Sequence, residues 1–210
     1  SPNFAYATGL LASDGCLYND GRHICFVSKD LEQIENFITC FEIKAKIGIS
    51  KSGYKETKAF RVQISDVDFY NFLISIGITH AKSKTIGDVK IPKKYFFDFL
   101  RGIFDGDGCF YSYWDPRWKS SHMFYVTFSS ASKKHIDWIQ KEIFEIVNLS
   151  GHISKSQNKR SIYNLRYAKK EALVIIKKMY YNPDIVCLSR KRIKIEKALE
   201  VEKKQQKQYI

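Results

Sequence analysis

The stretch Leu100-Arg101-Gly102-Ile103-Phe104-Asp105-Gly106-Asp107-Gly108 decides how the rest of the chain is interpreted, and a related stretch lies at Ala7-Thr8-Gly9-Leu10-Leu11-Ala12-Ser13-Asp14-Gly15. Each is predicted to be a short apolar helix that stops at Asp-Gly, because glycine often ends a helix in the left-handed conformation. Small residues recur in both at helical spacing, so each helix has one face without bulk. We therefore expect the two helices to cross closely, with Asp14 and Asp107 at their C-termini.

The carboxylates of Asp14 and Asp107 are poorly placed at these positions. The C-terminal end of a helix already carries partial negative charge, and a second carboxylate close by adds repulsion. A divalent metal ion would relieve that repulsion. For one copy alone, an ordinary helix cap and turn is the simpler interpretation, whereas two copies in a repeated context favour a functional pair.

The two stretches resemble the paired motifs of the LAGLIDADG homing endonucleases, in the single-chain form with two motifs. The matching residues are Leu100, Gly102, Ile103, Asp105, Asp107 and Gly108 in the second copy, and Gly9, Leu10, Asp14 and Gly15 in the first. Ala12 replaces the motif's inner acid, but the outer acid, which is the metal ligand in the family, is present in both copies. The resemblance implies a Mg²⁺ site at Asp14 and Asp107, together with Gly15 and Gly108.

Composition indicates a globular protein with a polyanionic partner. The chain has 210 residues, of which 44% are hydrophobic, and 35 Lys and Arg against 22 Asp and Glu give a net charge of +13. Nucleic acid is therefore a better candidate than an anionic membrane. No apolar run is long enough to span a bilayer and the first residues are no signal peptide, so we expect a soluble intracellular protein of bacterial, phage or organellar origin. Cysteine and histidine spacings indicate no disulfide framework or zinc site, and no motif supports a protease or an ATP-driven enzyme.

The two motifs lie within a longer duplication. Asp14 and Asp107 are 93 residues apart, whereas Phe26 and Phe128 are 102 apart. The second copy therefore has a hairpin that is nine residues longer. We predict an α+β fold of two pseudo-symmetric αββαββα halves, residues 1–88 and 93–210, which form a saddle with a concave antiparallel β-sheet surface. The elements expected in the first half after its motif are a hairpin over 16–28, a helix over about 30–42, strands over 47–50 and 60–65, and a helix over about 66–76. A basic helix is expected from residue 188 onward.

The face of each sheet that is not covered by helices is expected to bind double-stranded DNA. Side chains alternate along a strand, so residues that share parity with the motif aspartates point to this face. Arg, Gln and Asn suit base edges in the major groove, and Lys on turns suits phosphates. The candidates are Tyr18, Arg22, His23, Lys51, Lys55, Lys58, Arg61, Gln63, Tyr111, Tyr113, Arg117, Lys119, Tyr125, Lys155, Lys159, Arg160, Asn164 and Arg166. The alternative is an ordinary solvated sheet face.

Two similar basic segments follow the last sheet-covering helix of each half, at 81–86 and 188–193. The family resemblance implies that one basic residue in each reaches the active centre and polarises water or phosphate. Lys84 and Lys191 align best for this role, with Lys82 and Arg190 as rivals. Phosphate binding or solubility is the alternative.

The resemblance implies a monomeric, Mg²⁺-dependent endonuclease that makes a double-strand break in a long asymmetric DNA site, in the homing of an intron or similar mobile element. One alternative is a non-cleaving relative that acts as an intron RNA maturase or as a DNA-binding regulator. The presence of both outer acids argues against it, because folding alone would tolerate Asn or Ser there. A generic basic RNA-binding protein is a further alternative, but it would need neither the paired Asp-Gly ends nor the duplication.

Overall fold

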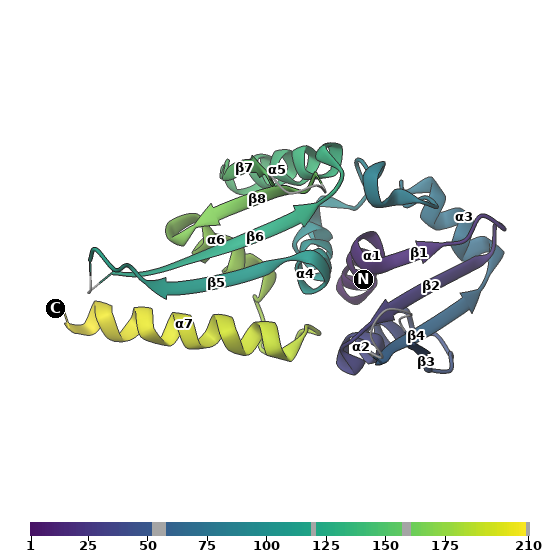
Figure 1. The fold of residues 1–210 in the computed structure, drawn as a ribbon, viewed down its shortest axis with the longest axis horizontal. Helices are drawn as coiled ribbons and strands as arrows, with labels where there is room; N and C mark the ends of the chain where they lie inside the picture. The colour runs from purple at the N-terminus through teal and green to yellow at the C-terminus, as the bar shows by residue number, and fades with distance from the viewer. Residues whose placement is uncertain (52–57, 119–120, 157–160, 209–210) are drawn as a thin grey trace.

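Two helices, α1 (Pro2–Asp14) and α4 (Phe96–Asp107), cross at the centre of the molecule, and one four-stranded sheet lies on each side of them (Figure 1). The computed structural model describes residues 1–51, 58–118, 121–156 and 161–208. Within these residues the chain has an α+β fold in which the αββαββα order occurs twice, as expected.

The first repeat continues after α1 with β1 (Gly15–Leu17), β2 (His23–Ser28), α2 (Leu31–Phe41), β3 (Gly48–Lys51), β4 (Lys58–Ser65) and α3 (Val67–Ser75). Two short 3₁₀ helices, η1 (Lys82–Lys84) and η2 (Lys93–Tyr95), connect it to α4. The second repeat continues with β5 (Cys109–Trp114), β6 (His122–Ser130), α5 (Lys133–Val147), β7 (His152–Lys155), β8 (Tyr163–Ala168), α6 (Lys169–Met179) and the long helix α7 (Ser189–Gln208).

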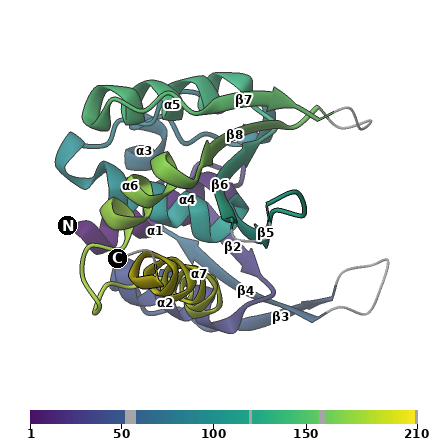
Figure 2. The same cartoon turned by 90° about the vertical axis from the view of Figure 1, so that its left-hand side faces the viewer.

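The two sheets have the same antiparallel topology, β1-β2-β4-β3 and β5-β6-β8-β7. Their registers also correspond, since Phe26 pairs with Val62 in one sheet and Phe128 with Leu165 in the other. The longer second hairpin is present as the extended β5 and β6 strands, which pair from Cys109 with Thr127 to Trp114 with His122. In Figure 2 the two repeats are viewed down the long axis of the molecule.

The crossing of α1 and α4 depends on glycine. A Cβ on Gly9 would overlap the carbonyl oxygen of Phe99, and a Cβ on Gly102 would overlap that of Tyr6. Because neither residue has a side chain, the two backbones lie in direct contact, and the small-residue faces expected from the sequence are confirmed.

The glycines that end these helices act differently from the expectation. Gly15 (φ −76°, ψ 156°) and Gly108 (φ −81°, ψ 158°) are extended rather than left-handed, so that prediction was wrong. Each begins or adjoins a strand without any intervening turn. Glycine is needed there for space, because a Cβ would lie 2.7 Å from the Leu11 carbonyl oxygen in one case and 2.6 Å from that of Phe104 in the other.

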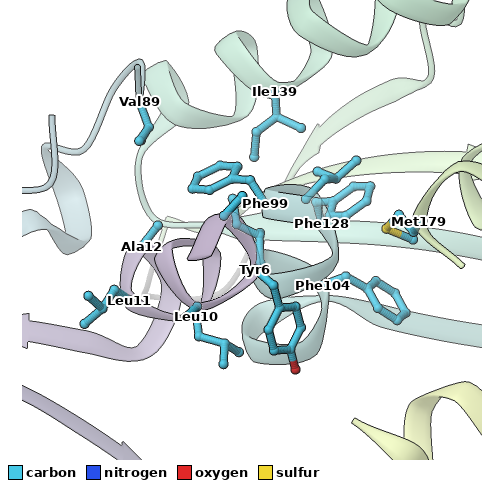
Figure 3. Packing of buried hydrophobic residues seen from close by; sticks show 14 of the residues in the cluster. Tyr6, Leu10, Leu11, Ala12, Val89, Phe99, Phe104, Phe128, Ile139 and Met179 are labelled. Carbon is cyan, nitrogen blue, oxygen red and sulfur yellow. The ribbon is translucent and has the colours of Figure 1, made fainter. Parts of the chain in front are cut away.

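One hydrophobic core extends through both repeats and surrounds the helix pair. Figure 3 shows five of its side chains around the helix pair, Tyr6 and Leu10 of α1, Phe99 and Phe104 of α4, and Phe128 of the second sheet. All five side chains are fully buried.

None of the helices in the described part of the chain has the length and apolar character needed to cross a membrane.

The glycine contact predicts that replacing a helix glycine by alanine lowers the free energy of unfolding, although such a change usually raises it. Alanine is a better helix former than glycine by about 1 kcal/mol, yet Gly102→Ala should lower the free energy of unfolding by about 1–3 kcal/mol, because its methyl group forces the helices apart. Gly87→Ala is the matched control, since a Cβ there meets nothing within 4 Å. Equal melting temperatures for the two variants would contradict this account of the crossing.

Candidate active site at the paired helix ends

Asp14 and Asp107 are the last residues of α1 and α4, and both side chains are open to solvent. The Asp14 carboxylate lies over the last turn of α4, because a Cβ placed on Gly106 would be 2.8 Å from Asp14 Oδ2. The glycine crossing therefore brings the two expected carboxylates to one place.

Two buried lysines reach these helix ends from the segments that follow α3 and α6. Lys82 Nζ donates to the carbonyl oxygens of Ser13 (3.3 Å) and Gly15 (2.5 Å). Lys191 Nζ donates to the carbonyl oxygens of Phe104 (2.5 Å), Gly106 (3.2 Å) and Gly108 (2.7 Å). The final carbonyls of a helix have no partners within it and carry partial negative charge, so an ammonium group satisfies them well.

The structure places Lys82, rather than the expected Lys84, at the end of α1. Lys84 is exposed, whereas the side chain of Lys82 is turned inward at the start of η1, directly after Ala81 in the left-handed conformation (φ 50°). In the other segment the expected Lys191 does reach the helix end. Its rival Arg190 instead forms an ion pair with Asp30.

Asp14, Lys82, Asp107 and Lys191 form one electrostatic unit, which we name the helix-end cluster. Desolvation, and then the charge of Asp107, raises the pKa of Asp14 to about 6, while both lysines oppose the rise. The pKa of Asp107 is raised as well, mainly by desolvation. Burial lowers the pKa of each lysine, and the Asp14 charge opposes that change. Two carboxylates thus share a small volume with two desolvated ammonium groups.

The carboxylates of this cluster fit a hard divalent cation. Mg²⁺ sites in nucleic-acid enzymes use one or two carboxylates and take further oxygen ligands from water and substrate phosphate. Asp14 and Asp107 offer such donors with open access to solvent. The carbonyl oxygens of Gly15 and Gly108, which were expected to contribute, accept hydrogen bonds from the two lysines. In the described ranges no three His, Cys, Asp or Glu side chains gather into a metal-binding group.

The uncovered face of the first sheet carries the polar residues that strand parity predicts. Cys16 pairs with Cys25, which pairs with Gln63 on the next strand. Arg61 lies beside this row and donates to Tyr18 Oη (2.9 Å), to Cys25 Sγ (3.2 Å) and to Gln63. The side chains of Tyr18, Cys25 and Gln63 are therefore held together by Arg61 as one hydrogen-bonded group on the sheet.

The matching face of the second sheet is aromatic. The ring centroids of Tyr111 and Tyr113 are 5.4 Å apart, those of Tyr113 and Tyr125 are 6.3 Å apart, and Arg166 lies over the Tyr125 ring at 5.6 Å. Asn164 Oδ1 accepts a hydrogen bond from Ser129 Oγ at 2.7 Å. The two faces thus differ in chemistry although their topology is the same.

The remaining candidates are on turns and strand ends. Arg22, Lys58 and Lys155 are exposed, His23 pairs with Asp20 in its own hairpin, and Arg117 pairs with Asp115 at 3.0 Å. Four predicted residues, Lys55, Lys119, Lys159 and Arg160, lie outside the described residues, and only the backbone of Lys51 is described.

Comparison with known proteins finds similarity in structure alone. No family model and no curated protein matches this sequence. Full-length DUF199/WhiA from Thermatoga maritima superposes with a TM-score of 0.61 at 13% identity, over 98% of this chain and 61% of that one. This chain therefore spans less than two thirds of WhiA, whose N-terminal domain is described as a LAGLIDADG domain.

Two DNA-bound homing endonucleases are also similar in structure. I-WcaI bound to its DNA recognition sequence has a TM-score of 0.60 at 13% identity, over 92% of this chain and 85% of that one. I-DmoI in complex with DNA and Ca has a TM-score of 0.57 at 13% identity, over 87% of this chain and 91% of that one. At these identities the likeness shows the fold, and the chain has a LAGLIDADG-like fold with both repeats in one chain.

Proposed function

We propose that the protein is a metal-dependent endonuclease that cuts both strands of a long, asymmetric DNA site. The helix-end cluster is the observation that supports this most directly, because it places two accessible carboxylates together between two uncovered sheet faces. A protein that only bound nucleic acid would gain nothing from two carboxylates near the phosphates, since they would repel them.

Asp14 and Asp107 would hold the metal, which we propose to be Mg²⁺. When bound, such an ion would lower the pKa of a water molecule and neutralise charge on the phosphate and the leaving oxygen. The chain itself supplies position and charge, which is most of what phosphoryl transfer requires of a protein. Lys82 and Lys191 place an ammonium group at each helix end, and both positive charges act on the two carboxylates, so a phosphate can approach in spite of the two negative charges.

The two sheet faces would bind the duplex on either side of the cluster. A net charge of +13 favours contact with the phosphate backbone. Arg61 and Gln63 on one face and Arg166 on the other suit bidentate contacts to base edges in the major groove. Because the matched positions on the two faces hold different residues, the two half-sites should differ in sequence. One chain carries both repeats, so we propose that it acts as a monomer.

The first test compares two aspartates of α4. Asp107→Asn should abolish cleavage of a site selected from a randomised duplex library in the presence of Mg²⁺, because it removes a metal-holding carboxylate. Asp105→Asn is the control, since the amide oxygen of Asn can still accept from Tyr6 Oη and Leu188 N, which now bond to Asp105 Oδ2 at 2.8 and 2.7 Å. Full cleavage by Asp107→Asn would show that the metal is on other residues.

The pKa of Asp14 generates a prediction about stability without metal. Its pKa is about 6 in the folded protein and 3.8 in the unfolded chain. Above pH 6 the Asp14 side chain is ionised and destabilises the fold, whereas below pH 4 it is protonated and has no such effect. Asp14→Asn should therefore raise the melting temperature at pH 7.5. The matching gain in the free energy of unfolding should be no more than about 1 kcal/mol, because solvent screens an exposed charge. The gain should disappear at pH 4.

A matched control for this prediction is Asp20→Asn. Its hydrogen bonds with His23 hold the pKa of Asp20 well below its usual range, so removing that charge at pH 7.5 should lower or leave unchanged the melting temperature. A rise for Asp20→Asn equal to that for Asp14→Asn would mean that net charge, rather than the position of Asp14, explains the effect.

The salt dependence of binding tests the duplex interface. The logarithm of the association constant should fall linearly with the logarithm of salt concentration, and Lys155→Ala should reduce the slope by about 1 for all sequences. Arg166→Ala should instead relax the preference at one base position. Lys133→Ala is the control, because Lys133 lies on the covering helix α5 and pairs with Asp137. A slope near zero for the unmodified protein would contradict the interface.

A further inference from the structure

The backbone at the start of helix α7 is hydrogen-bonded to two carboxylates that come from different repeats. The backbone N–H of Leu188 donates to Asp105 Oδ2 of α4 at 2.7 Å, and the N–H of Ser189 donates to both carboxylate oxygens of Glu32 at 3.0 and 3.1 Å. Glu32 lies in the first turn of α2, which belongs to the first repeat. The first N–H groups of a helix have no partners within it and carry partial positive charge, so both carboxylates stabilise this start.

Two more contacts bind the same segment to α2. Asn36 Nδ2 donates to the Cys187 carbonyl oxygen at 3.1 Å, and Arg190 donates to Asp30 through Nε (3.1 Å) and Nη2 (2.8 Å). The start of α7 lies next to α2 in both views (Figures 1 and 2). Residues 187, 189 and 190 are therefore each bonded to the first repeat, and we name these contacts the α2 latch.

Lys191 is the next residue after the α2 latch. Its ammonium group bonds to the end of α4, in the second repeat, while the turn that carries it is bonded to the first repeat. The second repeat also holds the segment before the latch, since Arg101 Nε donates to the Val186 carbonyl oxygen at 3.0 Å. Contacts from both repeats therefore hold the turn that carries Lys191.

The segment that carries Lys82 is held in a corresponding way. Ser132 Oγ donates to the Ile86 carbonyl oxygen at 2.5 Å, and His135 Nδ1 lies 2.7 Å from the Gly87 carbonyl oxygen. Ser132 is the N-cap of α5, as Asp30 is the N-cap of α2, and the two are 102 residues apart like other equivalent pairs. We name these contacts the α5 latch. Each lysine segment is thus bonded to the covering helix of the opposite repeat, through charged groups in one case and neutral groups in the other.

We infer that Asp30 and Glu32 are positioning residues for Lys191, and that Ser132 and His135 are positioning residues for Lys82. Each lysine then reaches the end of its own helix only while the two repeats are docked together. The inference about catalysis rests on the proposed function, and adds that each lysine acts at the phosphate nearest to its helix end. The two latches would then be separable controls on the two strand cuts.

The catalytic test follows each strand separately, on a duplex labelled on both 5′ ends. Asp30→Arg replaces the ion pair with Arg190 by repulsion between two positive charges. It should slow the cut of one strand by about 10-fold or more, because a small displacement of a catalytic group such as Lys191 is costly. The other strand should be cut at the normal rate, so nicked duplex accumulates. The charge-swapped variant Asp30→Arg/Arg190→Asp should restore the cut, and Ser132→Ala should slow the opposite strand. Equal slowing of both strands, as from simple destabilisation, would overturn the inference.

A second test does not depend on cleavage. Acetylation of the folded full chain by an N-hydroxysuccinimide ester, read by peptide mass spectrometry, reports how accessible each lysine is. Asp30→Arg should raise labelling of Lys191 several-fold and leave Lys82 unchanged, and Ser132→Ala should do the reverse, with exposed Lys94 as the internal standard. The charge-swapped variant should return Lys191 to its protected state.

The two tests separate the two proposals. An unmodified protein that binds DNA without cutting it would disprove the endonuclease, yet the labelling pattern would still decide whether the latches position the lysines. Unchanged labelling of Lys191 in a cooperatively folded Asp30→Arg variant would mean that Asp105 and Arg101 alone fix this segment, and the α2 latch would be rejected even if cleavage is confirmed.

Discussion

The direct contact between the backbones of α1 and α4 is the constraint on which the rest of the structure depends. Gly9 and Gly102 lack the side chains that would separate the helices, so each helix lies against a carbonyl oxygen of the other. This contact sets the separation of the two helix ends, and hence of Asp14 and Asp107. It also fixes where the two sheets begin, since each first strand follows its helix without a turn. A looser crossing would leave two distant acidic helix ends instead of a single cluster.

Much of the fold could be predicted from the sequence because its signals are local and occur twice. The spacing of small residues indicated the crossing, strand alternation indicated the uncovered faces, and the ordered offsets indicated two copies of one topology. The conformation of Gly15 was predicted wrongly, since a glycine needed for space and a glycine needed for a left-handed turn look the same in a sequence. Lys82 could not be separated from Lys84 for a related reason, because a left-handed residue at Ala81 decides which side chain points inward.

Contacts between distant residues were beyond the reach of sequence patterns. The hydrogen bonds from Tyr6 and Leu188 to Asp105 join residues that are 99 and 83 positions apart. They also explain an asymmetry in the motifs, since the acid at Asp105 bonds to the start of α7, whereas the corresponding Ala12 has no carboxylate to offer such a helix. A buried carboxylate is costly unless it is hydrogen-bonded, so an acid is expected where a partner N–H exists. The motif helix of the second repeat is therefore hydrogen-bonded to a following helix through its inner acid, whereas the motif helix of the first repeat has no acid at this position.

The extended conformation of Gly15 and Gly108 also limits how the sequence can evolve. Gly15 and Gly108 pass directly from helix to strand, so no loop separates the aspartates from the first residues of the uncovered faces, Cys16 and Cys109. Side chains alternate along a strand, so one residue inserted at either junction would turn the whole strand over and bury its polar face. Substitutions along the strands leave this phase untouched. The architecture can therefore vary what its surface recognises while the distance from that surface to the carboxylates stays constant.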